Sequence, residues 1–574
     1  MAAETCYRFL CFAPLDGSGP RIFGFAEFLT ALALMVLAWT IADVRYRFRL
    51  RTAPFPLEFA SFATVGILGA LTLLTDLWRA ERWPILVGPL ITPSAWQALL
   101  GAVFLFTFLG WVWFAFIVPP TYGPRNCLRY AQVLSLVILK GAPTELAVVA
   151  DEFTRSAKAV ILNAPERPPH PGVDAGATQP TKVAAVATQI LLLVGDRRFC
   201  RAVVESSPGA ALAVFHFMGE TKKYRVAVQT FARNIVDEAL RNRDSFLYHE
   251  TAGSESGMTG YMKPLTRAMF SNYAMVEAIQ TLFEAPDRWR SDGWRADALS
   301  AYCRIVLTTF RGYVASAFGQ HSVALTGAVS RIQNAVSDLH TLDGLTTSRY
   351  TDDIQERLRV VVEFAQDALD ILTEKEVPEQ LIWRRRETLG VRDRTFYDTL
   401  ADTIYWIMAA AASVRSPQDL CWLIQYSTVW SEFFNFGSSD SPASAVVRFK
   451  VRRRLYDEIA RMDRFPNYLS AHILGLCLNV MGFRVSDELV FADSRALHKA
   501  VLSWTRKNFA RLHSQNPRIA EACLVEGITY DAANHRLARR QAVREPGAEP
   551  VYVYFDVDPW PLARGRSPST PAVP

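Results

Sequence analysis

A polar stretch between two helix-like segments holds the side chains best suited to chemistry. Residues 247–264 read LYHETAGSESGMTGYMKP. His249 and Glu250 could exchange protons with a bound molecule, and Lys263 could pair with a negative charge. Three glycines permit tight turns, and Tyr261 could form one wall of a pocket. These residue types suit a site for a ligand, for a protein partner or for acid–base catalysis.

Three interpretations of residues 247–264 remain open. A connection between helices is the simplest, because serine and threonine hydroxyls would satisfy free backbone groups at the helix ends. A binding loop is the second and a catalytic site the third, since loops of this length are often functional. We assign no catalytic residue. The expected ligand- or partner-binding residues are His249, Glu250, Ser254, Glu255, Tyr261 and Lys263.

The sequence lacks the standard catalytic and nucleotide-binding signatures. It contains no GxxxxGK[ST] phosphate loop, no GxGxxG after a strand and no HExxH zinc pair. GSESG at 253–257 resembles a hydrolase nucleophile elbow, but Glu255 stands where GxSxG requires serine. The cysteines show neither a CxxC pair nor the spacing of zinc ligands. A protein that is not an enzyme is therefore favoured, and no metal or cofactor is predicted.

The charge balance argues against nucleic acid as a partner. The 62 basic and 56 acidic side chains leave a formal charge of +6, which is too diffuse for a phosphate-binding surface. Half of the residues are hydrophobic and the mean hydropathy is slightly positive, so some segments are expected in lipid. Most of the eight cysteines lie in apolar contexts typical of buried thiols. Cys6 and Cys11 differ, because they precede the first hydrophobic segment.

Three segments are long and apolar enough to cross a bilayer. They lie at 24–42, 59–77 and 95–118. A helix rises about 1.5 Å per residue, so each segment reaches or nearly reaches the roughly 30 Å of hydrocarbon. Charged residues occur only near the segment ends, which favours an anchor over a transport pathway. Small residues in the second segment, among them Gly66 and Gly69, would let it pack closely against another helix.

Basic residues indicate how these segments are oriented. They gather between the first and second segments and after the third, whereas fewer stand on the opposite side. The positive-inside rule therefore predicts an outside N-terminus and a cytoplasmic region from residue 119 to 574. The arginine-rich composition suits a bacterial inner (plasma) membrane. The basic residues assigned to the cytoplasmic side are Arg45, Arg47, Arg49, Arg51, Arg125, Arg129 and Lys140.

The pattern beyond the third segment is helical, so the expected fold class is all-α. Apolar residues recur at steps of three and four, as in 297–318 and 352–372. Two shorter segments, 403–414 and 468–483, are apolar nearly all round. We expect them to be the central helices of a large bundle.

The C-terminal residues change character. Residues 551–558, VYVYFDVD, alternate like a strand, and a partner around 522–531 would complete a small β-hairpin. The changes in composition and hydropathy along the chain together predict seven regions. These are an outside tail (1–22), a membrane domain of three helices (23–118), a membrane-proximal helical region (119–163), a flexible linker (164–182), a cytoplasmic α-helical domain (183–550), a strand (551–562) and a disordered tail (563–574).

This architecture predicts a non-catalytic function at the membrane. The cytoplasmic domain would bind a protein partner or act in signalling, and the spans would hold it at the inner membrane surface. One alternative is an oligomeric effector or channel gated by the cytoplasmic domain. Another is a membrane-tethered enzyme that uses the 247–264 loop. The expected partners are the lipid bilayer and either another protein or further copies of this chain.

Overall fold

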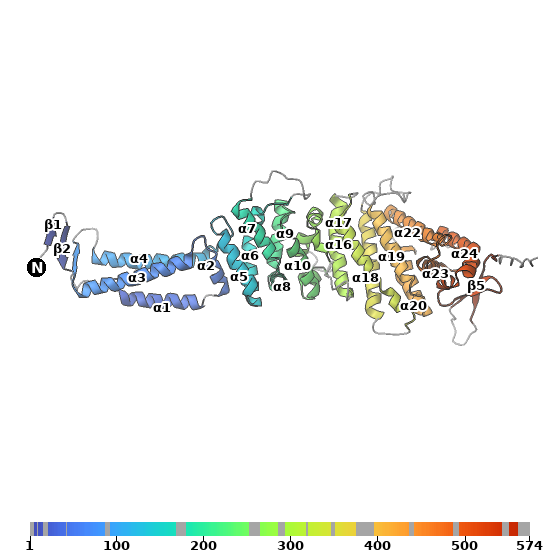
Figure 1. The fold of residues 1–574 in the computed structure, drawn as a ribbon, viewed down its shortest axis with the longest axis horizontal. Helices are drawn as coiled ribbons and strands as arrows, with labels where there is room; N and C mark the ends of the chain where they lie inside the picture. Colours follow the sequence, from blue (N-terminus) through green and yellow to red (C-terminus); the bar gives the residue numbers. More distant parts are fainter. Residues whose placement is uncertain are drawn as a thin grey trace, which may run out of the picture. The chain divides into compact units, whose positions relative to one another are not determined.

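Helices form most of the chain in a computed structural model (Figure 1). The predicted all-α class is confirmed, although short strands occur near both ends of the sequence. The chain forms two compact units, unit 1 from Met1 to Asn242 and unit 2 from Arg243 to Pro574. The structure describes residues 5–7, 10–14, 21–41, 43–86, 92–167, 180–251, 264–284, 293–316, 320–345, 351–374, 395–434, 441–485, 493–541 and 550–560.

Two helices in unit 1 are long and apolar enough to cross a bilayer. The first is α3 (Leu57–Ala80), with 24 residues. The second is α4 (Pro93–Val112), which continues without a break into the π-helical turn η1 (Trp113–Ile117) to make 25 residues. Both coincide with the second and third segments predicted from hydropathy.

The first predicted segment, 24–42, forms a shorter helix, α1 (Phe25–Ile41). Its 17 residues rise about 25 Å, which falls below the roughly 30 Å of hydrocarbon. By length and composition, the described residues therefore contain two candidate spans, one fewer than the sequence predicts. Asp43 begins the next helix, α2 (Val44–Arg51), by accepting a hydrogen bond from the Val44 N–H.

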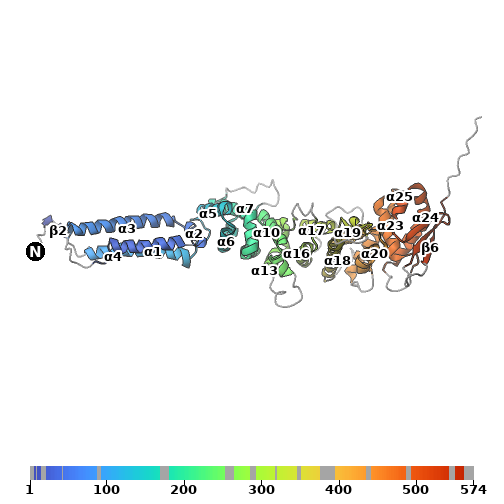
Figure 2. The same cartoon turned by 90° about the horizontal axis from the view of Figure 1, so that it is seen from below.

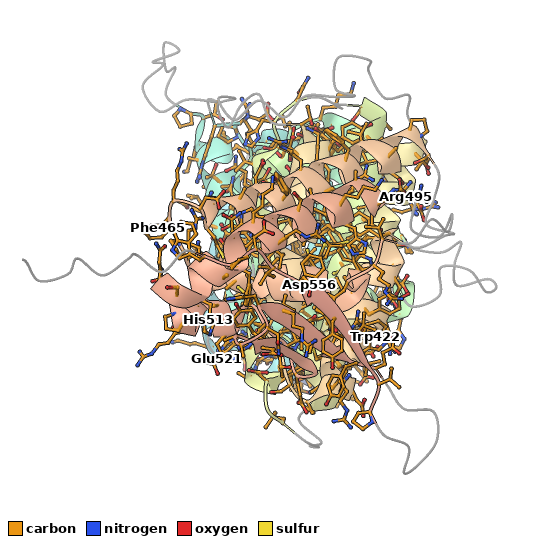
Figure 3. All side chains as sticks on the ribbon, turned by 90° about the vertical axis from the view of Figure 1, so that its right-hand side faces the viewer. Trp422, Phe465, Arg495, His513, Glu521 and Asp556 are labelled. Atoms are coloured by element: carbon orange, nitrogen blue, oxygen red, sulfur yellow. The ribbon has the colours of Figure 1, made fainter. Side chains whose placement is uncertain are left out.

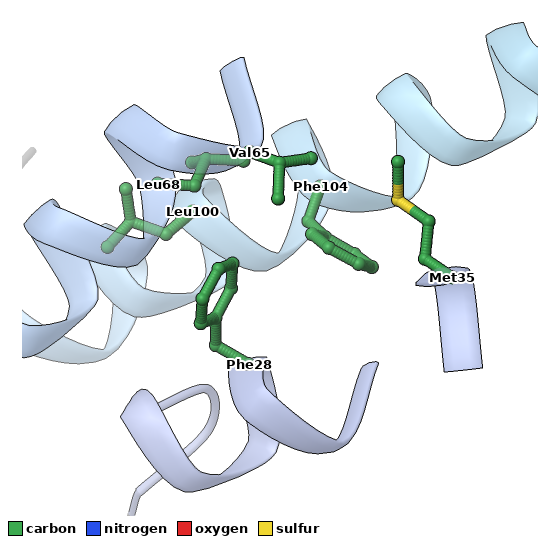
Figure 4. Packing of buried hydrophobic residues seen from close by; sticks show 6 residues of the cluster. All are labelled: Phe28, Met35, Val65, Leu68, Leu100 and Phe104. Carbon is green, nitrogen blue, oxygen red and sulfur yellow. The ribbon is translucent and has the colours of Figure 1, made fainter. Parts of the chain in front are cut away.

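The helices α1, α3 and α4 pack around one hydrophobic cluster (Figure 4). Gly69 allows α1 and α3 to approach closely, since a Cβ there would stand 2.8 Å from the Phe28 ring. The outward faces are apolar as well, with Phe59 76% and Phe106 71% exposed. An apolar exterior around an apolar interior suits lipid better than water. The members of the cluster are Phe28, Met35, Val65, Leu68, Leu100 and Phe104.

A small antiparallel sheet joins the N-terminal residues to the connection between α3 and α4. Its strands lie in the order β1 (Thr5–Tyr7), β2 (Leu10–Pro14) and β3 (Pro84–Leu86). Both neighbouring pairs are antiparallel. The sequence does not predict these strands, because each is too short to show a clear alternation of apolar and polar residues.

Most of the remaining helices of unit 1 surround α6 (Pro143–Asn163). Its apolar face is completely buried, with Val149, Phe153 and Val160 at zero exposure. It packs against α8 and α9, and it also contacts α2. In both ribbon views, α2 lies between the apolar bundle and helices α5 and α6 (Figures 1 and 2). The surrounding helices are α5 (Cys127–Lys140), α7 (Lys182–Leu193), α8 (Arg197–Ser206) and α9 (Pro208–Thr221), and α10 (Gln229–Arg241) packs against α8.

Unit 2 contains the two central helices that the sequence predicts. These are α19 (Phe396–Ala411) and α23 (Tyr468–Met481), and most of their residues are buried. The longer helices pack in pairs, α16 against α18 and α19 against α22. The other elements are α11 (Phe246–Thr251), α13 (Pro264–Phe270), α14 (Tyr273–Ile279), η2 (Thr281–Phe283), α16 (Ala296–Ser316), α17 (Val323–Asn334), η3 (Leu339–Leu342), α18 (Thr351–Thr373), α20 (Gln418–Trp422), η6 (Leu423–Trp430), α21 (Ser431–Phe434), α22 (Pro442–Arg461), α24 (Arg495–Gln515) and α25 (Pro517–Ala522).

Unit 2 ends in a three-stranded antiparallel sheet, in the order β4 (Ile528–Asp531), β5 (Arg536–Arg540) and β6 (Tyr552–Asp556). The predicted C-terminal strand is confirmed as β6. Its predicted partner is wrong, because β6 pairs with β5 and only β5 pairs with β4. The sequence of β5, RLARR, is mostly charged and shows no alternation of apolar and polar residues. The sequence therefore does not predict this strand.

The close approach of α1 to α3 yields a mutational test. Gly69→Ala should destabilise the protein by about 1–3 kcal/mol, because the new methyl group forces the Phe28 ring to move. Gly66→Ala is the matched control, since nothing lies within 4 Å of a Cβ at that position. Thermal unfolding of the full-length protein in mild detergent compares the two variants. Adding Phe28→Leu to Gly69→Ala should recover stability, and equal midpoints for the two glycine variants would contradict the packing.

Candidate functional site

The predicted polar loop lies mostly outside the described residues. This holds for Ser254, Glu255, Tyr261 and Lys263. His249 and Glu250 lie at the end of α11, where His249 is exposed and Glu250 is partly buried. The prediction that these six residues bind a ligand or partner therefore stays a prediction.

The Glu250 carboxylate makes contacts with the backbone at the start of α13. Its Oε2 accepts a hydrogen bond from the Thr266 N–H at 2.7 Å, and its Oε1 accepts one from the Leu265 N–H at 3.3 Å. The first N–H groups of a helix have no partner within the helix, and a negative charge there is favourable. Glu250 therefore caps α13, as expected for a connection between two helices. Beside it, burial raises the pKa of Tyr248 to about 12.

Metal-ligating residues do not gather in the part of the chain that the structure describes. No group of three or more His, Cys, Asp or Glu side chains there could hold a metal ion. A buried polar cluster is instead built around α2 in unit 1.

Arg49 on α2 connects three elements of unit 1. Its Nε and Nη2 donate to the two carboxylate oxygens of Glu152 on α6, at 2.9 and 2.6 Å. Its Nη1 donates to the carbonyl of Ala115 in η1 at 2.8 Å. One guanidinium group thus links α2 both to the end of the α4 segment and to α6.

The C-terminal end of α2 is held by residues at the start of α5. Asn126 Nδ2 donates to the Thr52 carbonyl at 2.8 Å, and Arg129 Nη1 donates to the Ala53 carbonyl at 2.5 Å. Carbonyls at a helix end lack partners within the helix, so these bonds satisfy them. We call this cluster the α2 joint. Its members are Arg49, Thr52, Ala53, Ala115, Asn126, Arg129 and Glu152.

Because Arg49 and Glu152 are both buried, each charge is stabilised mainly by the other. The side chains of Arg49 and Glu152 are only 7% and 3% exposed. The hydrogen bond to Glu152 raises the pKa of the Arg49 guanidinium, although burial alone would lower it. Bidentate bonding fixes the relative orientation of the two groups. Loss of Glu152 would leave the Arg49 charge buried without a carboxylate, and loss of Arg49 would leave Glu152 with only Arg45 Nε, 3.6 Å away.

The arginines between the first and second apolar segments, which predict the membrane orientation, also form contacts within unit 1. Besides Arg49, Arg45 Nη2 donates to Asp151 at 2.8 Å and Arg51 Nε donates to Glu58 at 3.3 Å. Arg47, on the same helix, is exposed. Most of the run is thus paired with carboxylates of the same unit. Sequence reasoning misses the joint, because Arg49 and Glu152 are 103 residues apart and no local pattern connects them.

Comparison with known proteins identifies no relative. No protein family model, no curated protein and no solved structure matches this chain. Its function is therefore inferred from its own residues and their geometry.

The α2 joint predicts unequal effects for two arginines on one helix. Arg49→Ala should lower stability by about 3–5 kcal/mol, because the buried Glu152 loses its bidentate partner and keeps only the longer contact with Arg45. Arg47→Ala should change it by no more than about 0.5 kcal/mol, as for other exposed sites. Thermal unfolding of the full-length protein in detergent measures both.

The double variant Arg49→Met, Glu152→Leu separates the charge from the packing. It should recover much of the stability lost in Arg49→Ala, since no charge remains buried. Similar midpoints for Arg47→Ala and Arg49→Ala would show that the buried pair does not hold the joint together.

Proposed function

We propose that this chain is an integral membrane protein whose helical region binds a protein partner at the cytoplasmic face of the membrane. The observation that carries the proposal is the α2 joint. A passive anchor needs only a flexible connection to its spans. Here a buried bidentate ion pair connects α6 with α2 and, through Ala115, with the end of the α4 segment. Such a connection gives the first helices after the spans a defined position.

Membrane insertion is supported by the outward faces of α3 and α4. Large apolar side chains such as Phe59, Ile67 and Phe106 are exposed there. Water penalises such a surface, whereas lipid chains solvate it. We include α1 as a third span, because Phe28 and Met35 share the bundle core. A helix of 17 residues is accommodated by local thinning of the bilayer and by its flanking residues.

The C-terminal sheet of unit 2 is the surface best suited to a protein partner (Figure 3). Tyr552 and Tyr554 on β6 are 42% and 50% exposed, and the Arg536 guanidinium lies 4.1 Å from the centre of the Tyr554 ring. Tyrosine and arginine are enriched in protein interfaces. Within the described residues, β6 is the last strand of its sheet and pairs with β5 alone. We assign its open edge to an extended segment of the partner, which would add a further strand.

This assignment predicts that partner recovery depends on the two tyrosines. In the double variant Tyr552→Ala, Tyr554→Ala, the recovered amount of a specific co-purifying protein should fall by about tenfold or more, because aromatic anchors dominate interface energy. The matched control is Phe465→Ala. Phe465 is 68% exposed and lies away from the sheet in Figure 3. The tagged full-length protein is crosslinked in its membrane, extracted in mild detergent and analysed by quantitative mass spectrometry. Equal recovery from both variants would contradict the assignment.

A second function, a membrane effector gated by the helical region, is favoured by η1. π-helical turns are rare and often lie at functional sites. This one ends the α4 segment and receives a hydrogen bond from Arg49 at Ala115. In this proposal the α2 joint holds the closed state of an assembly of several copies.

The effector proposal predicts leakage when the joint is neutralised. Full-length wild-type protein in liposomes should retain an entrapped dye, and the double variant Arg49→Met, Glu152→Leu should release it. Arg47→Ala serves as the control that keeps the joint and should retain the dye. Liposomes that stay tight with every variant would exclude gating through this joint.

A further inference from the structure

We propose that Cys6 and Cys11 form a disulfide across the N-terminal hairpin. The two cysteines are directly opposed partners in the β1–β2 ladder, in register between Thr5↔Phe12 and Tyr7↔Leu10. No other described cysteine pair is placed this way by strand register.

The backbone register satisfies the distance requirement of a disulfide. Opposed residues in an antiparallel ladder have Cα atoms about 4.5–5.5 Å apart. Disulfides span Cα separations of about 4.4–6.8 Å. Directly opposed residues also lie on the same face of the sheet. Cys6 and Cys11 therefore occupy a position at which the bond needs no rearrangement of the backbone.

The hairpin itself is too small to be stable without support. β1 and β3 have three residues each and β2 has five. An isolated two-stranded hairpin is marginal in water. A covalent link between the strands reduces the number of unfolded conformations, which is how small extracellular elements are commonly stabilised.

The chemistry requires an oxidising compartment, and here the inference rests on the proposed orientation with the N-terminus outside. Two thiols lose two protons and two electrons as the sulfur–sulfur bond forms. A disulfide oxidant of that compartment, either a protein or a small-molecule disulfide, accepts them by thiol–disulfide exchange and is itself reduced to two thiols. The other six cysteines are buried free thiols in the structure: Cys127, Cys200, Cys303, Cys421, Cys477 and Cys523.

Trypsin provides a direct test, because Arg8 lies between the two cysteines. The full-length protein is purified from membranes with free thiols blocked, and is digested without reductant. The expected product is one species in which the peptide ending at Arg8 is joined to the peptide 9–21. Reductant should separate the two peptides. The denatured chain should offer six alkylatable thiols before reduction and eight after.

Two variants make the result specific. Cys6→Ser should abolish the linked species and leave Cys11 as an added free thiol, whereas Cys127→Ser should preserve the linked species. Absence of the linked species from wild-type protein overturns the proposal. A membrane-impermeant maleimide added to intact cells then distinguishes a failure of the disulfide alone from a failure of the proposed membrane orientation. Labelling of Cys11 in Cys6→Ser leaves the orientation standing, and labelling only after lysis overturns the orientation as well.

Discussion

One buried charge pair, Arg49 with Glu152, fixes how α2, the end of the α4 segment and α6 meet in unit 1. Taking both charges out of water costs several kcal/mol per ion, so the pair is tolerable only when nearly every donor and acceptor is used. The guanidinium meets this condition by binding both carboxylate oxygens and the Ala115 carbonyl. Satisfying those bonds requires α2, the end of the α4 segment and α6 to be in place together. Helix α2, with only eight residues, would be marginal by itself.

Paired buried charges recur in unit 2, where they also join helices distant in sequence. Lys450 on α22 donates to Asp398 on α19 at 2.5 Å, and its side chain is almost completely buried. Asp398 is 19% exposed and also accepts a hydrogen bond from the Thr395 hydroxyl. In each unit, apolar burial supplies the stability and the charge pairs restrict which helix faces can meet.

The parts of the fold that sequence predicts are those set by local composition. The hydropathy of α3 and α4, and the apolar character of α19 and α23, are properties of each segment alone. The parts that it misses depend on distant partners. The strand β5 is mostly arginine and forms because β4 and β6 pair with it on either side. The α2 joint and the cap that Glu250 provides for α13 need contacts that no single window of sequence contains.

A distance measurement across the α2 joint tests the central claim most directly. Spin-labelled amino acids placed at Arg47 on α2 and Arg155 on α6, both exposed, would leave the buried pair intact. Pulsed electron–electron double resonance on the full-length protein in lipid nanodiscs then gives the distribution of their separation. A fixed joint predicts one narrow distribution that broadens when Arg49→Ala is added. A broad distribution in the otherwise unaltered protein would contradict a fixed joint and reduce the membrane helices to a flexible anchor.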